Sequence, residues 1–284
     1  MGALEPVTCT AMADETLSAA AAAELRPVQR WNGGAASLVP SDIACEVPIA
    51  FEYNGISHAV MLATPADLQD FAIGFSFSEG IAAAEQCYDV EVRESAAGIT
   101  LAIRIAAAAF ANLKAHRRTL AGRTGCGICG TESLDQVLRP LPDLSTQSLC
   151  IAPAALERAY AGLAGVQPLQ HRTGAAHGAV WCGADGTIVC AREDVGRHNA
   201  LDKLIGALLR TDTDTRAGFA LVTSRASVEM VQKSATAGIA VLAAVSAPTA
   251  LAVRTAESCG QTLVGFARGH TFSVYAHAAR IAGA

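Results

Sequence analysis

The C-terminal half of the sequence alternates apolar segments with segments of helical spacing, and this alternation constrains the fold more than any other feature. The apolar segments have strand length and lie at residues 178–183, 187–192, 217–223, 239–245 and 262–267. The helical segments between them lie at residues 197–210, 226–237 and 249–259. This order predicts a layered α/β domain on a largely parallel sheet, ending in a hairpin between 262–267 and 271–276.

The N-terminal half predicts a smaller α+β domain. Asn54-Gly55 separates two strand-like segments, 45–53 and 57–63, and supplies the positive φ angles of a tight hairpin turn. Thr64-Pro65-Ala66-Asp67 has the composition of a helix start, with Thr64 as the N-cap of a helix that runs to about residue 80. Strands near 88–94 and 98–105 would complete this domain.

These patterns predict an α/β protein, α+β overall, in four parts. We expect an Ala-rich extension at residues 1–38, loosely ordered or partly helical. A small α+β domain follows at 39–120, then a flexible Gly-rich connection at 121–152. The larger α/β domain occupies residues 153–284.

Charge and cysteine usage limit the partners and the compartment. The chain has 21 Lys and Arg against 26 Asp and Glu, for a formal net charge of −5. Nucleic acids and anionic membranes require a concentrated positive surface, so we expect neither as a partner. The N-terminus begins with acidic rather than basic residues, unlike a secretory signal, and nine scattered cysteines suit reduced thiols, so we expect a cytoplasmic protein.

The longest apolar stretch, residues 237–253, is too short and too interrupted for a membrane span. It contains Ser246, Pro248 and Thr249. We interpret it as a buried strand that enters a helix.

Cys126-Gly127-Ile128-Cys129 carries the most reactive chemistry in the sequence. Basic residues precede the two thiols, at positions 114, 116, 117, 118 and 123. Nearby cations favour the thiolate, which attacks disulfides, accepts sulfur as a persulfide or binds metal. A zinc site would need a second close pair, and Cys182 and Cys190 are poorly spaced for it, while a thioredoxin-like site would follow a buried strand. Sulfur transfer therefore fits best, although a zinc-binding or structural CxxC stays open.

Four further segments place polar groups next to predicted strands, where open α/β sheets bind ligands and helix N-termini attract anions. They are Arg172–Ala179, Arg192–Lys203, Thr223–Ser227 and Gly265–Thr271. Each also has an ordinary structural interpretation. The first segment could be a turn with a hydrogen-bonded His177, and the second a solvated turn with Asp202 and Lys203 exposed. The third could be an N-cap at Ser224, followed by a surface pair Glu229–Lys233. The fourth could be a plain hairpin turn.

Taken in order, five segments resemble the formate dehydrogenase accessory sulfurtransferase family over about residues 40–280. They are GRTGCGICGTESLD, RTGAAHGAVW, REDVGRHNALDKLIG, SRASVEMVQK and LVGFARGH. The resemblance implies a sulfurtransferase, a sulfur carrier that takes persulfide sulfur from a cysteine desulfurase. The sulfur would pass to the bis-molybdopterin guanine dinucleotide cofactor, with molybdenum or tungsten, before the cofactor is inserted into formate dehydrogenase. It also implies a homodimer.

The resemblance also assigns residues. Cys126 and Cys129 would form the persulfide pair, with the main persulfide on Cys126. The cofactor would contact Phe266, Ala267, Arg268, Gly269, His270 and Thr271. The guanine nucleotide pocket, for which GDP is a mimic, would be lined by Thr173, Gly174, His177, Asp194, Arg197, His198, Asn199, Ser224, Arg225 and Ser227. No resident metal is expected.

The family's larger domain is similar in fold to cytidine deaminases, but deaminase chemistry should be absent. Zinc deaminases need a His or Cys followed two residues later by Glu, and a downstream Pro-Cys-x-x-Cys. Here Gly178 and Ala179 follow His177, and the CxxC lies upstream. One departure from the family is Ala175, where another glycine is common and a left-handed backbone would be strained.

Two other functions stay open. A non-enzymatic molybdenum-cofactor-binding chaperone would use the CxxC for zinc or for structure, and a thiol-disulfide oxidoreductase ranks last. Six other cysteines are expected to be small buried hydrophobic residues, at positions 45, 87, 150, 182, 190 and 259.

Overall fold

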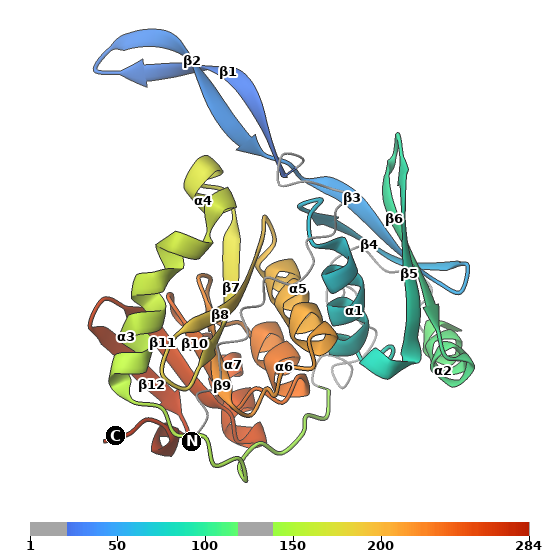
Figure 1. Cartoon of the computed structure of the whole chain (residues 1–284), viewed down its shortest axis with the longest axis vertical. Coiled ribbons are helices and arrows are strands. Elements are labelled where there is room, and N and C mark those ends of the chain that lie inside the picture. The colour runs from blue at the N-terminus through green and yellow to red at the C-terminus, as the bar shows by residue number, and fades with distance from the viewer. Residues whose placement is uncertain (1–21, 119–138, 284) are drawn as a thin grey trace, which may run out of the picture.

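A computed structural model describes residues 22–118 and 139–283 (Figure 1). A long hairpin arm projects from a body made of two α/β parts. The arm is formed by β1 (Ala23–Asn32) and β2 (Ala35–Ala44), which pair in antiparallel register around Gly33-Gly34. The expectation of a loosely ordered or partly helical extension is therefore wrong for residues 23–38. Residues 1–21 lie outside the described part of the chain.

The small part is a four-stranded sheet covered on one face by a helix. Its strands are β3 (Val47–Tyr53), β4 (Ile56–Ala63), β5 (Cys87–Ser95) and β6 (Gly98–Ile105), in the order β4-β3-β6-β5. The expected Asn54-Gly55 hairpin is present, with both residues at positive φ. The aromatic side chains of Phe51, Phe71 and Phe75 pack in the core between the sheet and helix α1 (Leu68–Ser78). Helix α2 (Ala107–Arg118) follows β6.

Thr64 is not the N-cap of α1, as the sequence predicted. The helix begins after Asp67, which has a left-handed backbone. Thr64 is instead fully buried against the larger part of the chain. Its N–H donates to Asp194 Oδ2 (3.0 Å), its Oγ1 accepts from the N–H of Val195 (3.1 Å), and its carbonyl accepts from Lys203 Nζ (2.9 Å). Long-range partners thus override a local capping signal.

The larger part is a six-stranded sheet between two helical layers. Its strands are β7 (His177–Gly183), β8 (Ile188–Asp194), β9 (Gly218–Val222), β10 (Val241–Ala244), β11 (Thr262–Arg268) and β12 (Thr271–Ala276). Helices α3 (Pro153–Gly162) and α4 (Pro168–Thr173) precede β7, and α3 packs on one face of the sheet. The other face is covered by α5 (Arg197–Arg210), α6 (Val228–Thr236) and α7 (Ala250–Cys259).

The strand order is β12-β11-β10-β9-β7-β8, and the α/β class is confirmed. The expected hairpin between β11 and β12 is also present. The sheet is mixed, however, and not largely parallel. Only the pairs β9–β10 and β10–β11 are parallel in this sheet. Strand β7 pairs antiparallel with β9 on one side and with β8 on the other.

The segment just before α3 also differs from the prediction of a flexible connection up to residue 152. Leu144 is buried against Cys259 and Ala235, and its N–H donates to the carbonyl of Cys259 (2.8 Å). Ile151 forms a parallel bridge with Ile281. Residues 141–152 therefore belong to the larger part.

The two parts join through a close contact between α1 and α5. A Cβ on Gly74 would lie 1.8 Å from the carbonyl oxygen of Asp202, and one on Gly206 would lie 1.9 Å from that of Asp70. Real Cβ atoms cannot approach so closely, so the two backbones touch where neither residue has a side chain.

Candidate functional site at one edge of the large sheet

The mixed topology brings four of the predicted segments to one edge of the larger sheet. The parallel strands β9 and β11 end there, which places Ser224–Ser227 and Phe266–Thr271 at this edge. Strand β7 is antiparallel to β9, so its first residue, His177, lies at the same edge. His177 pairs directly with Asp194, the last residue of β8. Ligands bind at such strand ends in open α/β sheets.

Residues 245–249 connect these segments, and the sequence interpretation missed them. The N–H of Ala226 donates to the carbonyl of Ala247 (3.2 Å), and the N–H of Phe266 donates to that of Ser246 (3.1 Å). The turn after β10 is thus hydrogen-bonded both to the turn after β9 and to the end of β11. The interruption of the apolar stretch by Ser246 and Pro248 was the available signal, and it marks this edge.

The edge carries concentrated positive charge. His177 is partly buried, and burial together with the charge of Arg197 lowers its pKa from the ordinary value. His198 and Arg225 add to the same effect. The Nε of Arg197 is buried and has no hydrogen-bond partner among the described residues, while Arg225 is exposed. A group of cations with an unused donor favours an anionic ligand.

Two helix N-termini point to the same edge. Helix α5 begins after Gly196 and α6 after Ser227, and neither N-cap has a side-chain hydrogen bond to its first turn. Helix α5 also lacks an acidic residue in its first turn. Free N–H groups and the positive end of the helix dipole add to the attraction for an anion.

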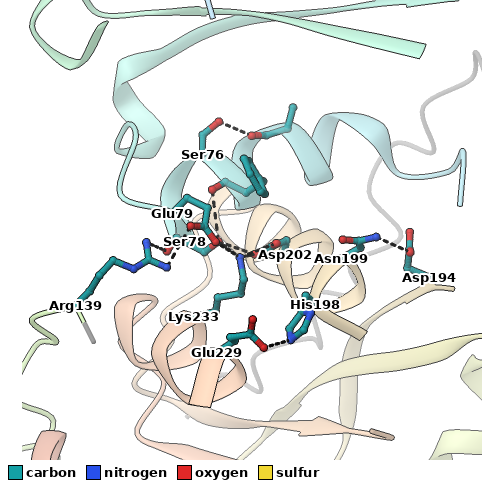
Figure 2. Close-up of polar contacts among 12 residues, drawn as sticks. Ser76, Ser78, Glu79, Arg139, Asp194, His198, Asn199, Asp202, Glu229 and Lys233 are labelled. Atoms are coloured by element: carbon teal, nitrogen blue, oxygen red, sulfur yellow. Dashed lines mark hydrogen bonds and ion pairs between the residues drawn. The ribbon is translucent and has the colours of Figure 1, made fainter. Parts of the chain in front are cut away.

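His198 and Glu229 form an ion pair that links these two N-termini (Figure 2). Their Nε2 and Oε2 atoms lie 2.7 Å apart, and each side chain is about one-quarter exposed, at 27% and 22%. Burial would raise the pKa of Glu229, but the hydrogen bond and charge of His198 outweigh it and lower the pKa. The sequence interpretation of Glu229 and Lys233 as a surface pair is wrong, because the Lys233 side chain is buried and contacts Asp202 and Glu79.

Asp194 and Asn199 stabilise the backbone at the start of α5 from inside the protein. Both are buried. Asp194 Oδ1 accepts from the N–H of Gly196 (2.8 Å) and from Asn199 Nδ2 (3.0 Å), and Asn199 Nδ2 also donates to the carbonyl of Leu62 (2.9 Å). Asp194 Oδ2 lies 2.6 Å from Lys203 Nζ. The polar groups of both side chains therefore form hydrogen bonds and an ion pair where the two parts of the chain meet. Neither side chain is exposed as the lining of a pocket.

Asp202 and Lys203 are buried, so the sequence interpretation of a solvated turn is wrong for both. Lys233 Nζ lies 2.9 Å from both carboxylate oxygens of Asp202 and 2.7 Å from Glu79 Oε1, and Ser78 Oγ donates to Asp202 Oδ1 (2.5 Å) (Figure 2). Burial would raise the pKa of Glu79, but the charge of Lys233 and a second cation lower it to about 2. The joint is thus ionic as well as closely packed.

Thr173 and Gly174 lie at the end of α4. Thr173 Oγ1 donates to the carbonyl of Leu169 (2.8 Å), and Gly174 ends the helix with φ of 68°. Ala175 is not among the residues with positive φ, so the replacement of the family's glycine causes no strain there. Thr173 and Gly174 shape the turn that leads into His177.

The last residues of β11 present an aromatic ring and a cation. Phe266 has φ of 52°, and the guanidinium carbon of Arg268 lies 5.5 Å from the centre of its ring. Ala267 is buried, whereas Arg268, Gly269 and Thr271 are exposed. His270 is also exposed and pairs with Glu157 Oε2 (2.9 Å).

Cys126 and Cys129 lie outside the described residues, within 119–138. The chain re-enters the described part at Arg139, which donates to the carbonyl of Ser78 (3.1 Å) and pairs with Glu79 (3.2 Å) (Figure 2). Of the other cysteines, Cys182, Cys190 and Cys259 are buried as expected. Cys45 and Cys87 are half-buried, and Cys150 is exposed, so the expectation is wrong for Cys150.

Within residues 22–118 and 139–283, no His, Cys, Asp and Glu side chains form a group able to hold a metal ion. None of the helices in the range is long and apolar enough to cross a membrane.

The fold and this edge define a mixed α/β protein in which basic side chains and two helix N-termini gather at one edge of the larger sheet. Residues 44–282 match the FdhD/NarQ family, and the chain belongs to that family. It is 56% identical over 256 residues to the sulfur carrier protein FdhD of Cupriavidus necator, covering 89% of this chain and 88% of that protein. It is 53% identical over 266 residues to the sulfur carrier protein FdhD of Variovorax paradoxus, covering 92% and 94%.

A solved structure shares the fold. It is described as a formate dehydrogenase accessory protein of Desulfotalea psychrophila, and it matches with a TM-score of 0.70 at 24% identity. The match covers 91% of this chain and 99% of that one.

Proposed function

We propose that this protein is a cytoplasmic sulfurtransferase that carries sulfur for the activation of formate dehydrogenase. The observation that carries the proposal is membership of the FdhD/NarQ family, with relatives named sulfur carrier protein at more than half identity. The family resemblance of the CxxC segment supplies the chemistry. The cytoplasm is the compartment in which such thiols stay reduced.

The first step loads Cys126. Its thiolate attacks the terminal sulfur of a persulfide on a cysteine desulfurase, forms a new sulfur–sulfur bond and displaces the desulfurase cysteine as a thiolate. No net oxidation occurs in this exchange. The basic residues before the CxxC favour the thiolate that the attack requires.

The second step releases sulfur. The Cys129 thiolate attacks the inner sulfur of the Cys126 persulfide, forms a Cys126–Cys129 disulfide and releases hydrosulfide to the metal of the bis-molybdopterin guanine dinucleotide cofactor. A dithiol reductant then restores the two thiols. The metal is molybdenum or tungsten, and the sulfurated cofactor passes to formate dehydrogenase.

The edge of the large sheet supports binding of that cofactor. Arg197, His198 and Arg225 with two helix N-termini suit the pyrophosphates of a dinucleotide. Phe266 offers a ring on which a guanine can stack, beside Arg268. Asp194 and Asn199 act as positioning residues for Gly196 and the start of α5.

A loading experiment tests the proposal. The purified protein is incubated with a cysteine desulfurase and L-cysteine, and the peptide that contains both thiols is weighed without reduction. A gain of one sulfur, about 32 Da, is expected on Cys126 or Cys129 and is lost in the Cys126→Ala/Cys129→Ala variant. An unmodified peptide with stoichiometric zinc, or formate dehydrogenase activity that persists with the double variant, would favour the cofactor-binding chaperone instead.

A further inference from the structure

The ligand edge, where His177, Arg197 and Arg225 gather with two helix N-termini, also carries a carboxylate. Glu229 lies in the first turn of α6 and pairs with His198 in the first turn of α5 (Figure 2). Burial alone would raise the pKa of Glu229, but the hydrogen bond and charge of His198, with the charge of Arg197, lower it. The carboxylate is therefore ionised at neutral pH.

One oxygen of this carboxylate is held and the other is open. Oε2 of Glu229 lies 2.7 Å from His198 Nε2 and accepts from Ser227 Oγ (3.3 Å). Oε1 accepts no hydrogen bond from the part of the chain that the structure describes. An ionised carboxylate only accepts, and its two oxygens offer about four acceptor sites. Glu229, whose side chain is 22% exposed, thus presents spare acceptors in a fixed orientation at the ligand edge.

The surroundings of Glu229 limit the part of a ligand that it can face. Arg197, Arg225 and the helix N-termini attract phosphates, and a carboxylate repels them. Glu229 must therefore face a different part of the same ligand, one that donates hydrogen bonds. Phe266, near the end of β11, offers a ring on which a flat base stacks. Phosphates, a flat ring and a donor group together describe a nucleotide.

The pattern of donors and acceptors on the base decides which nucleotide fits a carboxylate. Guanine presents N1–H and an exocyclic amine side by side, and both donate. Adenine presents its amine beside the N1 lone pair, and cytosine presents its amine beside the N3 lone pair, so in each base a lone pair would face a carboxylate oxygen. Uracil has a single N–H between two carbonyl oxygens. Guanine is therefore the base that matches a carboxylate with two adjacent donors.

We propose that Glu229 selects guanine by accepting hydrogen bonds from N1–H and from the exocyclic amine of the base. Oε1 takes one donor, and Oε2 takes the other, because its contact with Ser227 is long. His198 and Ser227 act as positioning residues that fix Oε2. The inference rests on the proposed function, which supplies a cofactor that carries nucleotides, and it adds the residue that reads the base.

Calorimetric titration of the full chain with GDP, IDP and ADP tests the proposal without any variant. IDP carries hypoxanthine, which keeps N1–H and lacks the exocyclic amine. A hydrogen bond to a charged group contributes about tenfold or more to affinity, so we expect IDP to bind about tenfold more weakly than GDP. ADP sets a lone pair against the carboxylate, and we expect it to bind about a hundredfold more weakly.

Glu229→Gln should remove this preference. His198 and Ser227 both contact Oε2, so the amide oxygen of the new side chain takes that place and its NH₂ group faces the base. A donor then meets the donors of guanine, whereas it matches the N1 lone pair of adenine. We expect the ratio of GDP affinity to ADP affinity to fall from about 100 to about 1.

Two control variants separate base selection from general effects of charge. Arg225→Gln should weaken GDP and ADP by the same factor, because both nucleotides carry the same diphosphate. Glu257→Gln, at an exposed position in the last turn of α7, should keep the wild-type ratio. Circular dichroism verifies that each variant is folded.

Three results would overturn the proposal. They are a wild type that binds ADP as tightly as GDP, a wild type that binds none of the three nucleotides, and a Glu229→Gln protein that loses GDP and ADP binding equally. The last result would mark a structural role for Glu229 and nothing more. Sulfur loading on the CxxC does not involve the base, so a failure of base selection and a failure of the proposed sulfur carrier are distinguishable.

Discussion

Removal of the Lys203 ammonium should destabilise the protein strongly. Lys203 and Asp194 are both fully buried, 2.6 Å apart, at the joint between the two parts. In Lys203→Met the Asp194 carboxylate loses its countercharge but keeps three N–H donors, from Thr64, Gly196 and Asn199. Loss of one partner of a buried ion pair costs about 3–5 kcal/mol, and these donors favour the lower end, about 3 kcal/mol. For a chain of this size that corresponds to a fall in Tm of about 6 °C or more.

Differential scanning calorimetry with urea unfolding would measure this loss. Lys114→Met, at an exposed lysine of α2, is the matched control and should change stability by less than about 0.5 kcal/mol. The double variant Asp194→Asn/Lys203→Met should recover part of the loss, because no unpaired charge stays buried. A cost below about 1 kcal/mol for Lys203→Met, or a double variant less stable than the single one, would refute the argument.

Three further predictions concern the joint and the ligand edge. Gly206→Ala should cost about 3 kcal/mol or more in thermal unfolding, because its Cβ would lie 1.9 Å from the Asp70 carbonyl, whereas Gly165→Ala, in open space, should be neutral. The pKa of Glu79 is lowered from 4.5 to about 2, so its stabilisation is present above pH 4.5 and is lost as the pH falls toward 2. The stability difference between wild type and Glu79→Gln should shrink over that range, and a constant difference would contradict this. Arg225→Gln should weaken GDP binding about tenfold in calorimetric titration, and Arg216→Gln, beyond the other end of β9, should not.

The sequence predicted the elements of the larger part well because their burial is periodic. Helix α5 begins and ends where its polar start and apolar spacing indicate, and the strands of the large sheet lie close to their expected positions. The direction of β7 could not be predicted, since it depends on which neighbour the strand pairs with. That direction is what places His177 beside the ends of β8 and β9.

The buried charges were not predictable from local pattern. Asp202, Lys203 and Lys233 occupy helical positions that are typical of a solvated face. Lys233 pairs with Asp202 and Glu79, both distant from it in sequence, and Lys203 pairs with Asp194 across the turn between β8 and α5. The arm was missed for a similar reason. Its apolar residues alternate across a face that no other described element covers, so the sequence there lacks the signature of a buried strand.

The contact between Gly74 and Gly206 has a consequence for how this chain can vary. Each residue meets the backbone of the other helix, so a side chain gained at either position requires both helices to move. Recombination between distant relatives with a breakpoint between residues 74 and 206 would combine helices that never adapted to each other. We expect such chimaeras to be poorly soluble even when each half comes from a stable parent, and we expect the two parts to be inherited as a single unit.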